Sequence, residues 1–295
     1  MILHSICPLC SSGKISLYLK CTDHLLTSEE FDLCKCPECG FVFTRQYPDE
    51  NEIGRYYESE DYISHDDKAK GFLNHVYLRA RNLMLKRKKR IVEDSTGLEK
   101  GRILDIGCGT GYFPATMKKG GWDVTGIEPN GKARDFAIRH FSLDVISPEQ
   151  ISELPPGSFD CITLWHVLEH FHDPFRYADD IKRLLKPDGI CIAALPNSDS
   201  SDANYYGRFW AAYDVPRHLW HFNPETFRLF AEKSGFHITG TKSLPLDVFY
   251  ISILSEKNKG SKIHFLSGIT KGSLFTFRSL FNKRKSSSLI YIMKN

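Results

Sequence analysis

A glycine-rich turn that follows a short apolar run is the first pattern in this sequence with clear chemical potential. Gly107, Gly109 and Gly111 come directly after a run that ends in Asp105 and Ile106. Glycines at such a turn let the backbone approach a ligand closely, because no Cβ atom stands in the way. Nicotinamide, flavin and nucleotide folds share this kind of turn, so the glycines alone do not identify a ligand.

Two carboxylates narrow the choice of ligand. Asp105 precedes the first glycine by two residues, where it would repel a pyrophosphate and could hold loop amides or, through water, a ligand's ammonium group. Glu128 ends the next apolar run, where a carboxylate can accept two hydrogen bonds from a ribose diol. The turn also lacks the lysine of a phosphate-binding P-loop. A cationic sulfonium cofactor therefore fits this sequence best, and a tight turn without a ligand is the alternative.

Two Cys-x-x-Cys pairs lie near the N-terminus, formed by Cys7 with Cys10 and by Cys36 with Cys39. Four thiolates in two such pairs can close a tetrahedral shell around one zinc ion, which predicts a structural and not a catalytic metal. Thioredoxin-like redox chemistry is disfavoured, because no strand–helix–strand pattern surrounds either pair. Spare ligand candidates lie between the pairs: Cys21, His24 and Cys34.

A histidine-rich segment follows a later apolar run. His166, Glu169 and His170 form the His-x-x-Glu-His pattern with which one class of zinc peptidases holds its metal from a helix. Pro174 lies just beyond and the segment closes a strand, so a peptidase is disfavoured. His166 or His170 could instead serve as a general base, since imidazole titrates near neutral pH. A positioning or capping role also stays open.

The aromatic-rich segment 197–222 carries a second group of polar candidates. Loops at the carboxyl ends of parallel strands form the ligand crevice, so we expect this segment to act as a lid over a substrate. Arg217, His218 and His221 are candidates for binding an anionic substrate or for removing a proton. The alternative is a packed aromatic cap whose polar groups are satisfied internally.

The elements that position these residues alternate along the chain. Predicted strands lie at 102–106, 123–127, 143–146, 160–164 and 190–194, with helices at 112–119, 131–141 and 174–185 between them. This rhythm predicts right-handed βαβ crossovers and a parallel sheet. A helical pattern at 68–93 precedes them, and a helix at 224–234 and strands at 237–243, 247–254 and 288–293 follow.

Four ordered motifs in this region resemble those of class I S-adenosylmethionine (SAM)-dependent methyltransferases. They occupy 104–111, 126–129, 159–170 and 185–189, within a match that covers about residues 101–240. The resemblance implies an α/β, Rossmann-like, doubly wound sheet of seven strands whose last strand, here 288–293, is antiparallel.

The resemblance also implies how SAM is held. Asp105 and the three glycines would line its methionine end, and Glu128 would hold the ribose. Pro129, Ile146 and Ser147 would lie near the adenine, although the acid expected after the third strand is missing and Asp144 comes slightly early. Trp165 and His166 would face the sulfonium. Some relatives that act on hydroxyls bind a divalent metal through a Glu-x-x-Glu-His motif here, in which His166 replaces the first acid.

The resulting organisation is a zinc ribbon at 1–46, a helical linker or cap at 47–98 and a methyltransferase domain at 99–295. Within that domain we expect an acceptor lid at 197–222 and a variable insertion at 256–285. No apolar stretch reaches 18 residues and no secretory signal opens the chain, so a cytoplasmic protein without a membrane span is expected.

The function implied is methyl transfer from SAM to a small-molecule acceptor. Chains that join a zinc ribbon to such a domain resemble proteins of bacterial surface-sugar and secondary-metabolite clusters. An RNA or protein methyltransferase is the alternative, favoured by the ribbon and the basic run 86–90 but lacking an Asn/Asp-Pro-Pro-aromatic motif. Nucleic acid is therefore not favoured as a partner. A catalytically inactive adaptor is disfavoured because Asp105, Glu128 and the glycines are retained.

Overall fold

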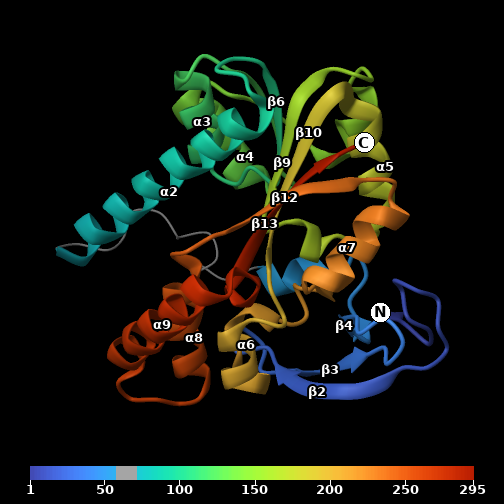
Figure 1. Ribbon diagram of the computed structural model, residues 1–295, viewed down its shortest axis with the longest axis vertical. Coiled ribbons are helices and arrows are strands. Elements are labelled where there is room, and N and C mark those ends of the chain that lie inside the picture. Colours follow the sequence, from blue (N-terminus) through green and yellow to red (C-terminus); the bar gives the residue numbers. More distant parts are fainter. Residues whose placement is uncertain (58–71) are drawn as a thin grey trace.

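A seven-stranded sheet forms the centre of the computed structural model, which describes residues 1–57 and 72–295 (Figure 1). The strand order is β12-β13-β10-β9-β6-β7-β8. Five strands are parallel: β6 (Arg102–Ile106), β7 (Asp123–Ile127), β8 (Asp144–Ile146), β9 (Phe159–Trp165) and β10 (Leu185–Pro196). The last strand, β13 (Ser288–Lys294), is antiparallel to both β10 and β12 (His237–Ser243). The predicted fold class is confirmed.

Helices cover both faces of this sheet because the strand side chains alternate between two cores. Ile103 points toward α2 (Phe72–Thr96) and α3 (Tyr112–Lys119), whereas Leu104 points toward α5 (Pro174–Leu184) and α7 (Pro224–Lys233). The helix α4 (Gly131–Phe141) closes the edge beside β8. No helix among the described residues has the length and apolar character needed to cross a membrane.

The N-terminal unit is a small antiparallel sheet to which the distant segment 197–222 adds one strand. Its strands are β2 (Ser16–Thr22), β3 (Glu30–Lys35) and β4 (Val42–Thr44), while β1 (Ile2–Leu3) pairs with β5 (Gln46–Tyr47). Strand β11 (Trp220–His221) adds to β4, with Trp220 opposite Phe43. Through β11, the segment 197–222, which also contains α6 (Ser201–Tyr206), is thus part of the ribbon sheet.

The strand predicted at 247–254 is wrong, because these residues form the helix α8 (Asp247–Asn258). The β-branched and aromatic content of this run favoured a strand, but Val248, Ile251 and Ser255 are buried at helical spacing. It pairs with α9 (His264–Phe281), which fills most of the predicted insertion 256–285. A Cβ atom at Gly268 would lie 2.5 Å from the backbone of Ile253, so glycine is what allows the two helices to approach.

The helix predicted at 68–93 is observed from Phe72 to Thr96. Its first four predicted residues, 68–71, lie outside the described part of the chain, as do residues 58–67 of the predicted linker.

Candidate active site and metal centre

The three glycines of the turn differ in the structural reason for which glycine is needed at each position. All three adopt positive φ, at +71° for Gly107, +56° for Gly109 and +84° for Gly111. A Cβ atom at Gly107 would lie 2.5 Å from Val167, and one at Gly111 would lie 2.8 Å from Ala137, so packing demands glycine at both. A Cβ atom at Gly109 would meet nothing within 4 Å. The middle glycine therefore presents bare backbone to open space, where a ligand can lie against it.

Glu128 is held beside this open side of the turn. One carboxylate oxygen accepts the amide hydrogen of Gly109 at 2.7 Å and the other that of Asn130 at 2.8 Å. Burial raises the pKa of Glu128, and the two amide hydrogen bonds oppose that shift. Each oxygen keeps a further lone pair, so the carboxylate can still accept hydrogen bonds from a diol.

Asp105 lies below the turn at the end of β6. It is buried and accepts a hydrogen bond from the Thr163 hydroxyl at 2.6 Å. Burial raises its pKa to about 7, against the lowering effect of this hydrogen bond and of the Lys88 charge. The group therefore changes charge near neutral pH, as perturbed carboxyls at functional sites often do.

A cation of the protein lies next to Asp105. The Lys88 ammonium lies 4.5 Å from the centre of the Trp165 ring, and it interacts with Asp105 and with Asp247 of α8. Burial lowers the pKa of Lys88 while the two carboxylates raise it. Aromatic face and carboxylates together are the environment that favours ammonium or sulfonium groups. Neither Lys88 nor Asp247 is among the site residues that the sequence predicts.

The residues expected near an adenine ring lie at the carboxyl ends of β7 and β8. Pro129 is exposed, Ile146 and Ser147 are half-buried, and the Glu128 amide donates to the Ile146 carbonyl. Asp144 opens β8 and pairs with Thr125 at 3.4 Å, so its carboxylate lies at the other end of the strand.

His166 sits in a left-handed conformation, at φ +61°, between two acidic side chains. Its Nε2 lies 2.8 Å from the Asp247 carboxylate and its Nδ1 lies 3.5 Å from that of Glu169. Burial lowers the pKa of His166, but the two carboxylates outweigh it and raise the pKa to about 9. His166 is consequently an imidazolium at neutral pH, which suits it to hold a negative partner and not to accept a proton.

His170 is the neutral histidine of the site. Its Nδ1 lies 3.1 Å from the Arg217 carbonyl and 3.0 Å from the Tyr57 hydroxyl. Burial and the neighbouring His218 lower its pKa to about 4. Because a carbonyl can only accept, Nδ1 carries the hydrogen and Nε2 keeps its lone pair.

Three of the four candidate histidines converge around one buried acid. Glu169, His170 and His218 each place a ligand atom within 4.8 Å of the others, and the Glu169 oxygens have no hydrogen-bond partner among the described residues. The His-x-x-Glu-His residues occupy a strand end and a 3₁₀ turn, not one helix, so the peptidase arrangement is not formed. His221 lies apart, with its Nε2 3.2 Å from Thr44 in the ribbon.

Arg217 ties the ribbon to the segment 197–222. Its buried guanidinium reaches the carboxylate of Asp214 at 2.7 Å, that of Asp23 in the ribbon at 2.8 Å and the Tyr56 carbonyl at 3.0 Å. Through these hydrogen bonds the guanidinium donates to protein acceptors along more than one of its edges. The guanidinium of Arg217 is therefore engaged in contacts within the protein, and an anionic ligand would have to displace a buried carboxylate to bind it.

The four cysteines of the ribbon meet at one point. Cys7 and Cys39 bring their Sγ atoms to 3.6 Å, as do Cys10 and Cys36, and all four sulfurs lie within 4.8 Å of one another. Zinc–sulfur bonds of about 2.3 Å in a tetrahedron require sulfur–sulfur separations of roughly 3.8 Å. Gly40 at φ +76° turns the chain after the second pair. The geometry fits a single tetrahedral ion.

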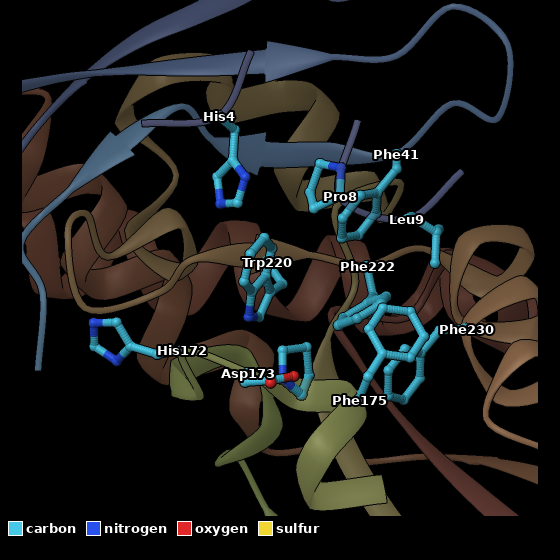
Figure 2. A pocket seen from close by; sticks show the side chains of 11 residues that line it. His4, Pro8, Leu9, Phe41, His172, Asp173, Phe175, Trp220, Phe222 and Phe230 are labelled. Atoms are coloured by element: carbon cyan, nitrogen blue, oxygen red, sulfur yellow. The ribbon is translucent and has the colours of Figure 1, made fainter. Parts of the chain in front are cut away.

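Aromatic residues pack the ribbon against the rest of the protein, and Figure 2 shows Phe41, Trp220 and Phe222 among them. The Phe41 ring lies 5.1 Å from Phe222 and 6.2 Å from Trp220. They border a cavity of about 150 Å³ where the ribbon meets the start of α5. The carboxylate of Asp173 there caps α5 by accepting from the Arg176 amide. The lining is otherwise mostly aromatic or aliphatic, so the cavity belongs to the packing of the ribbon and not to the polar site.

Known proteins resemble the chain over the region that contains this site. The model of a family described as a methyltransferase domain matches residues 74–240. The ubiquinone biosynthesis O-methyltransferase of Psychrobacter cryohalolentis is 34% identical over 110 residues, which are 34% of this chain and 43% of that protein. The same enzyme of Pseudomonas aeruginosa is 36% identical over 106 residues, 33% and 45% of the two chains. The chain thus spans less than half the length of these curated relatives.

Among solved structures, the geranyl diphosphate C-methyltransferase from Streptomyces coelicolor A3(2) has a TM-score of 0.54 at 13% identity. The match covers 83% of this chain and 97% of that one, whose structure holds Mg²⁺, geranyl diphosphate and S-adenosyl-L-homocysteine. At this identity the likeness concerns the fold alone.

Proposed function

This chain belongs to the methyltransferase-domain family of class I SAM-dependent methyltransferases, and from that premise we propose that it methylates a small-molecule acceptor beside the histidine cluster. The observation that carries the proposal is the bare backbone of Gly109, whose amide donates to the Glu128 carboxylate, near enough to the buried Asp105 for the two carboxylates to interact. Glu128 would accept hydrogen bonds from the ribose hydroxyls of SAM. Asp105 would attract its methionine ammonium group.

The acceptor would lie between this cleft and the segment 197–222. SAM supplies the methyl group, which leaves the sulfonium as the acceptor oxygen or nitrogen forms its bond to the methyl carbon. The lone pair on Nε2 of His170 can take the proton that a hydroxyl or ammonium acceptor loses. The positive charge of His166 would hold a developing or resident negative charge on the acceptor. Positioning of the two reactants supplies the remaining acceleration.

A divalent metal at Glu169, His170 and His218 is the second candidate role for this cluster. The buried Glu169 oxygens favour it, because they have no hydrogen-bond partner among the described residues and only the His166 ring at 3.5 Å faces them, and a buried carboxylate is costly without such bonds. In that arrangement the ion and not His170 would bind the acceptor oxygen. Metal content measured after purification and after dialysis against Mg²⁺ or Mn²⁺ separates the two roles.

For the ribbon we propose one structural zinc ion held by Cys7, Cys10, Cys36 and Cys39. Four sulfur ligands leave no open position for a substrate. The role we infer is to stabilise a small sheet whose own core is limited, and through Arg217 and Phe41 to brace the segment 197–222.

A small-molecule acceptor is favoured over nucleic acid, because the cations of the basic run 86–90 do not form a continuous surface patch without contacts to the rest of the protein. Lys88 faces the site, Lys89 pairs with Glu93, and Arg87 donates to the Ser243 carbonyl. These contacts leave few cations in the run for phosphate groups.

Titration calorimetry with SAM tests the proposal. Wild-type protein is expected to bind SAM and its demethylated product, and Glu128→Ala should weaken both by roughly tenfold or more, because two hydrogen bonds to the diol are lost. Glu153→Gln, an exposed acid at the end of a neighbouring 3₁₀ turn, is the matched control and should bind normally. Failure of folded, zinc-loaded wild-type protein to bind SAM would leave the adaptor interpretation in its place.

A further inference from the structure

The hairpin of α8 and α9 leaves a row of large apolar side chains in water. Along α9, Leu266, Phe277 and Leu280 are 65%, 59% and 71% exposed, and Phe281 at its end is 79% exposed. The exposed Ile269 and Ser273 lie between them at helical spacing, so the row runs along one face. We call Leu266, Ile269, Phe277, Leu280 and Phe281 the apolar row.

The apolar row faces away from the rest of the protein. The opposite face of α9 contains Gly268, Gly272 and Phe275, which are buried against α8 and α6. Figure 1 shows the hairpin at one edge of the molecule, with α6 between it and the ribbon. Rotation of α9 to hide the row would bring side chains into the close helix contact at Gly268, so the fold holds the row outward. Exposed apolar surface of this kind marks a binding surface.

The chain around the apolar row is strongly basic. No aspartate or glutamate occurs from residue 257 to the end of the sequence, whereas nine lysines and arginines do. Lys262 precedes α9, Arg278 lies on it beside the row, and Lys283 follows it, all of them exposed. Arg284 and Lys285 are used in ion pairs with Glu225 and Asp199.

The exposed apolar side chains together with the neighbouring cations favour one kind of partner over the others that could cover an apolar surface. A second copy of the chain in a two-fold contact would bring two basic surfaces together, which like charges oppose. Lysine and arginine beside Phe, Leu and Ile on one helix are typical of helices that lie in the plane of a membrane surface. Anionic headgroups attract the cations, and the boundary with the acyl chains takes up the apolar side chains.

We propose that the α8–α9 hairpin docks this protein on an anionic phospholipid surface, with the apolar row of α9 inserted at the headgroup–acyl boundary. The surface depends on α9 and its flanking cations, and so it is independent of the methyl-transfer site. Binding is peripheral and reversible, and it weakens with added salt because part of the attraction is electrostatic.

Vesicle co-sedimentation of the full zinc-loaded chain tests this. Wild type should sediment with phosphatidylcholine vesicles that contain about a quarter phosphatidylglycerol, and at least about tenfold less with phosphatidylcholine alone. Phe277→Ser/Leu280→Ser removes two inserting side chains and should lower the partition coefficient about tenfold or more. Arg278→Glu/Lys283→Glu should lower it and remove its salt dependence. Leu17→Ser, which is 61% exposed on the ribbon, is the control and should bind as wild type.

Two results would overturn the proposal. One is equal sedimentation of wild type and Phe277→Ser/Leu280→Ser with anionic vesicles, or no sedimentation of either. The other is light scattering that shows a wild-type dimer, a monomeric Phe277→Ser/Leu280→Ser variant and no vesicle binding, which would assign the row to a second copy. The substituted side chains are exposed, so thermal unfolding of the variants should match that of wild type.

Discussion

Protonation of Asp105 should weaken SAM binding within one unit of neutral pH. Burial raises the pKa of this carboxyl to about 7, and only its ionised form attracts a cationic ligand. The ionised fraction is then about 91% at pH 8 and about 9% at pH 6. Since affinity scales with the competent fraction, the dissociation constant of SAM should rise about tenfold from pH 8 to pH 6, about 1.4 kcal/mol. Above pH 8 it should be nearly constant.

Calorimetry at fixed ionic strength between pH 6 and 8 measures this dependence. Buffers of different ionisation enthalpy add a second readout, because binding at pH 6 should release close to one proton. Asp105→Asn keeps the shape and the Thr163 contact but cannot ionise, so its affinity should be low at every pH. S-adenosylhomocysteine has the ammonium group without the sulfonium, so the same slope for both ligands identifies the ammonium as the partner. An unchanged wild-type affinity from pH 8 to 6, or a pH dependence that survives in Asp105→Asn, would show that Asp105 does not hold the ammonium group.

Three further outcomes follow from single contacts. Gly107→Ala should cost about 1–3 kcal/mol of unfolding free energy in urea, since its Cβ would meet Val167 at positive φ, whereas Gly109→Ala should chiefly weaken SAM binding. Arg217→Met should lower stability by about 3–5 kcal/mol, because the buried Asp23 carboxylate loses its partner, and a cost below about 1 kcal/mol in denaturant titration would contradict this. Cys36→Ser should reduce bound zinc from one equivalent toward none by elemental analysis and speed proteolysis of the ribbon, while Cys108→Ser should leave zinc unchanged.

The sequence predicted those parts of the molecule that local patterns encode. Alternating strands and helices indicated the sheet, and the glycines at 107–111 with Glu128 indicated a ligand cleft at the ends of β6 and β7. The two cysteine pairs, with 25 residues between Cys10 and Cys36, indicated one cluster. Each of these features follows from a pattern that is local in the sequence or from a motif that is repeated in it.

Contacts between segments that are far apart in the sequence could not be predicted from local patterns. Arg217 and Asp23 are 194 residues apart, and neither has a local pattern that pairs them. Lys88 belongs to a run of cations that is typical of a solvated face, and only the packing of α2 turns its side chain toward Asp105. Asp247 went unrecognised because the run that it opens was predicted as a strand, so its approach to His166 could not be foreseen.

SAM is expected to lie against Gly109 with its ribose on Glu128, and a crystal structure with S-adenosylhomocysteine would show whether it does. We expect both ribose hydroxyls within about 3.2 Å of the Glu128 carboxylate and the ammonium group directed at Asp105. A ribose held by other residues, with Glu128 still bonded only to the amides of Gly109 and Asn130, would contradict it.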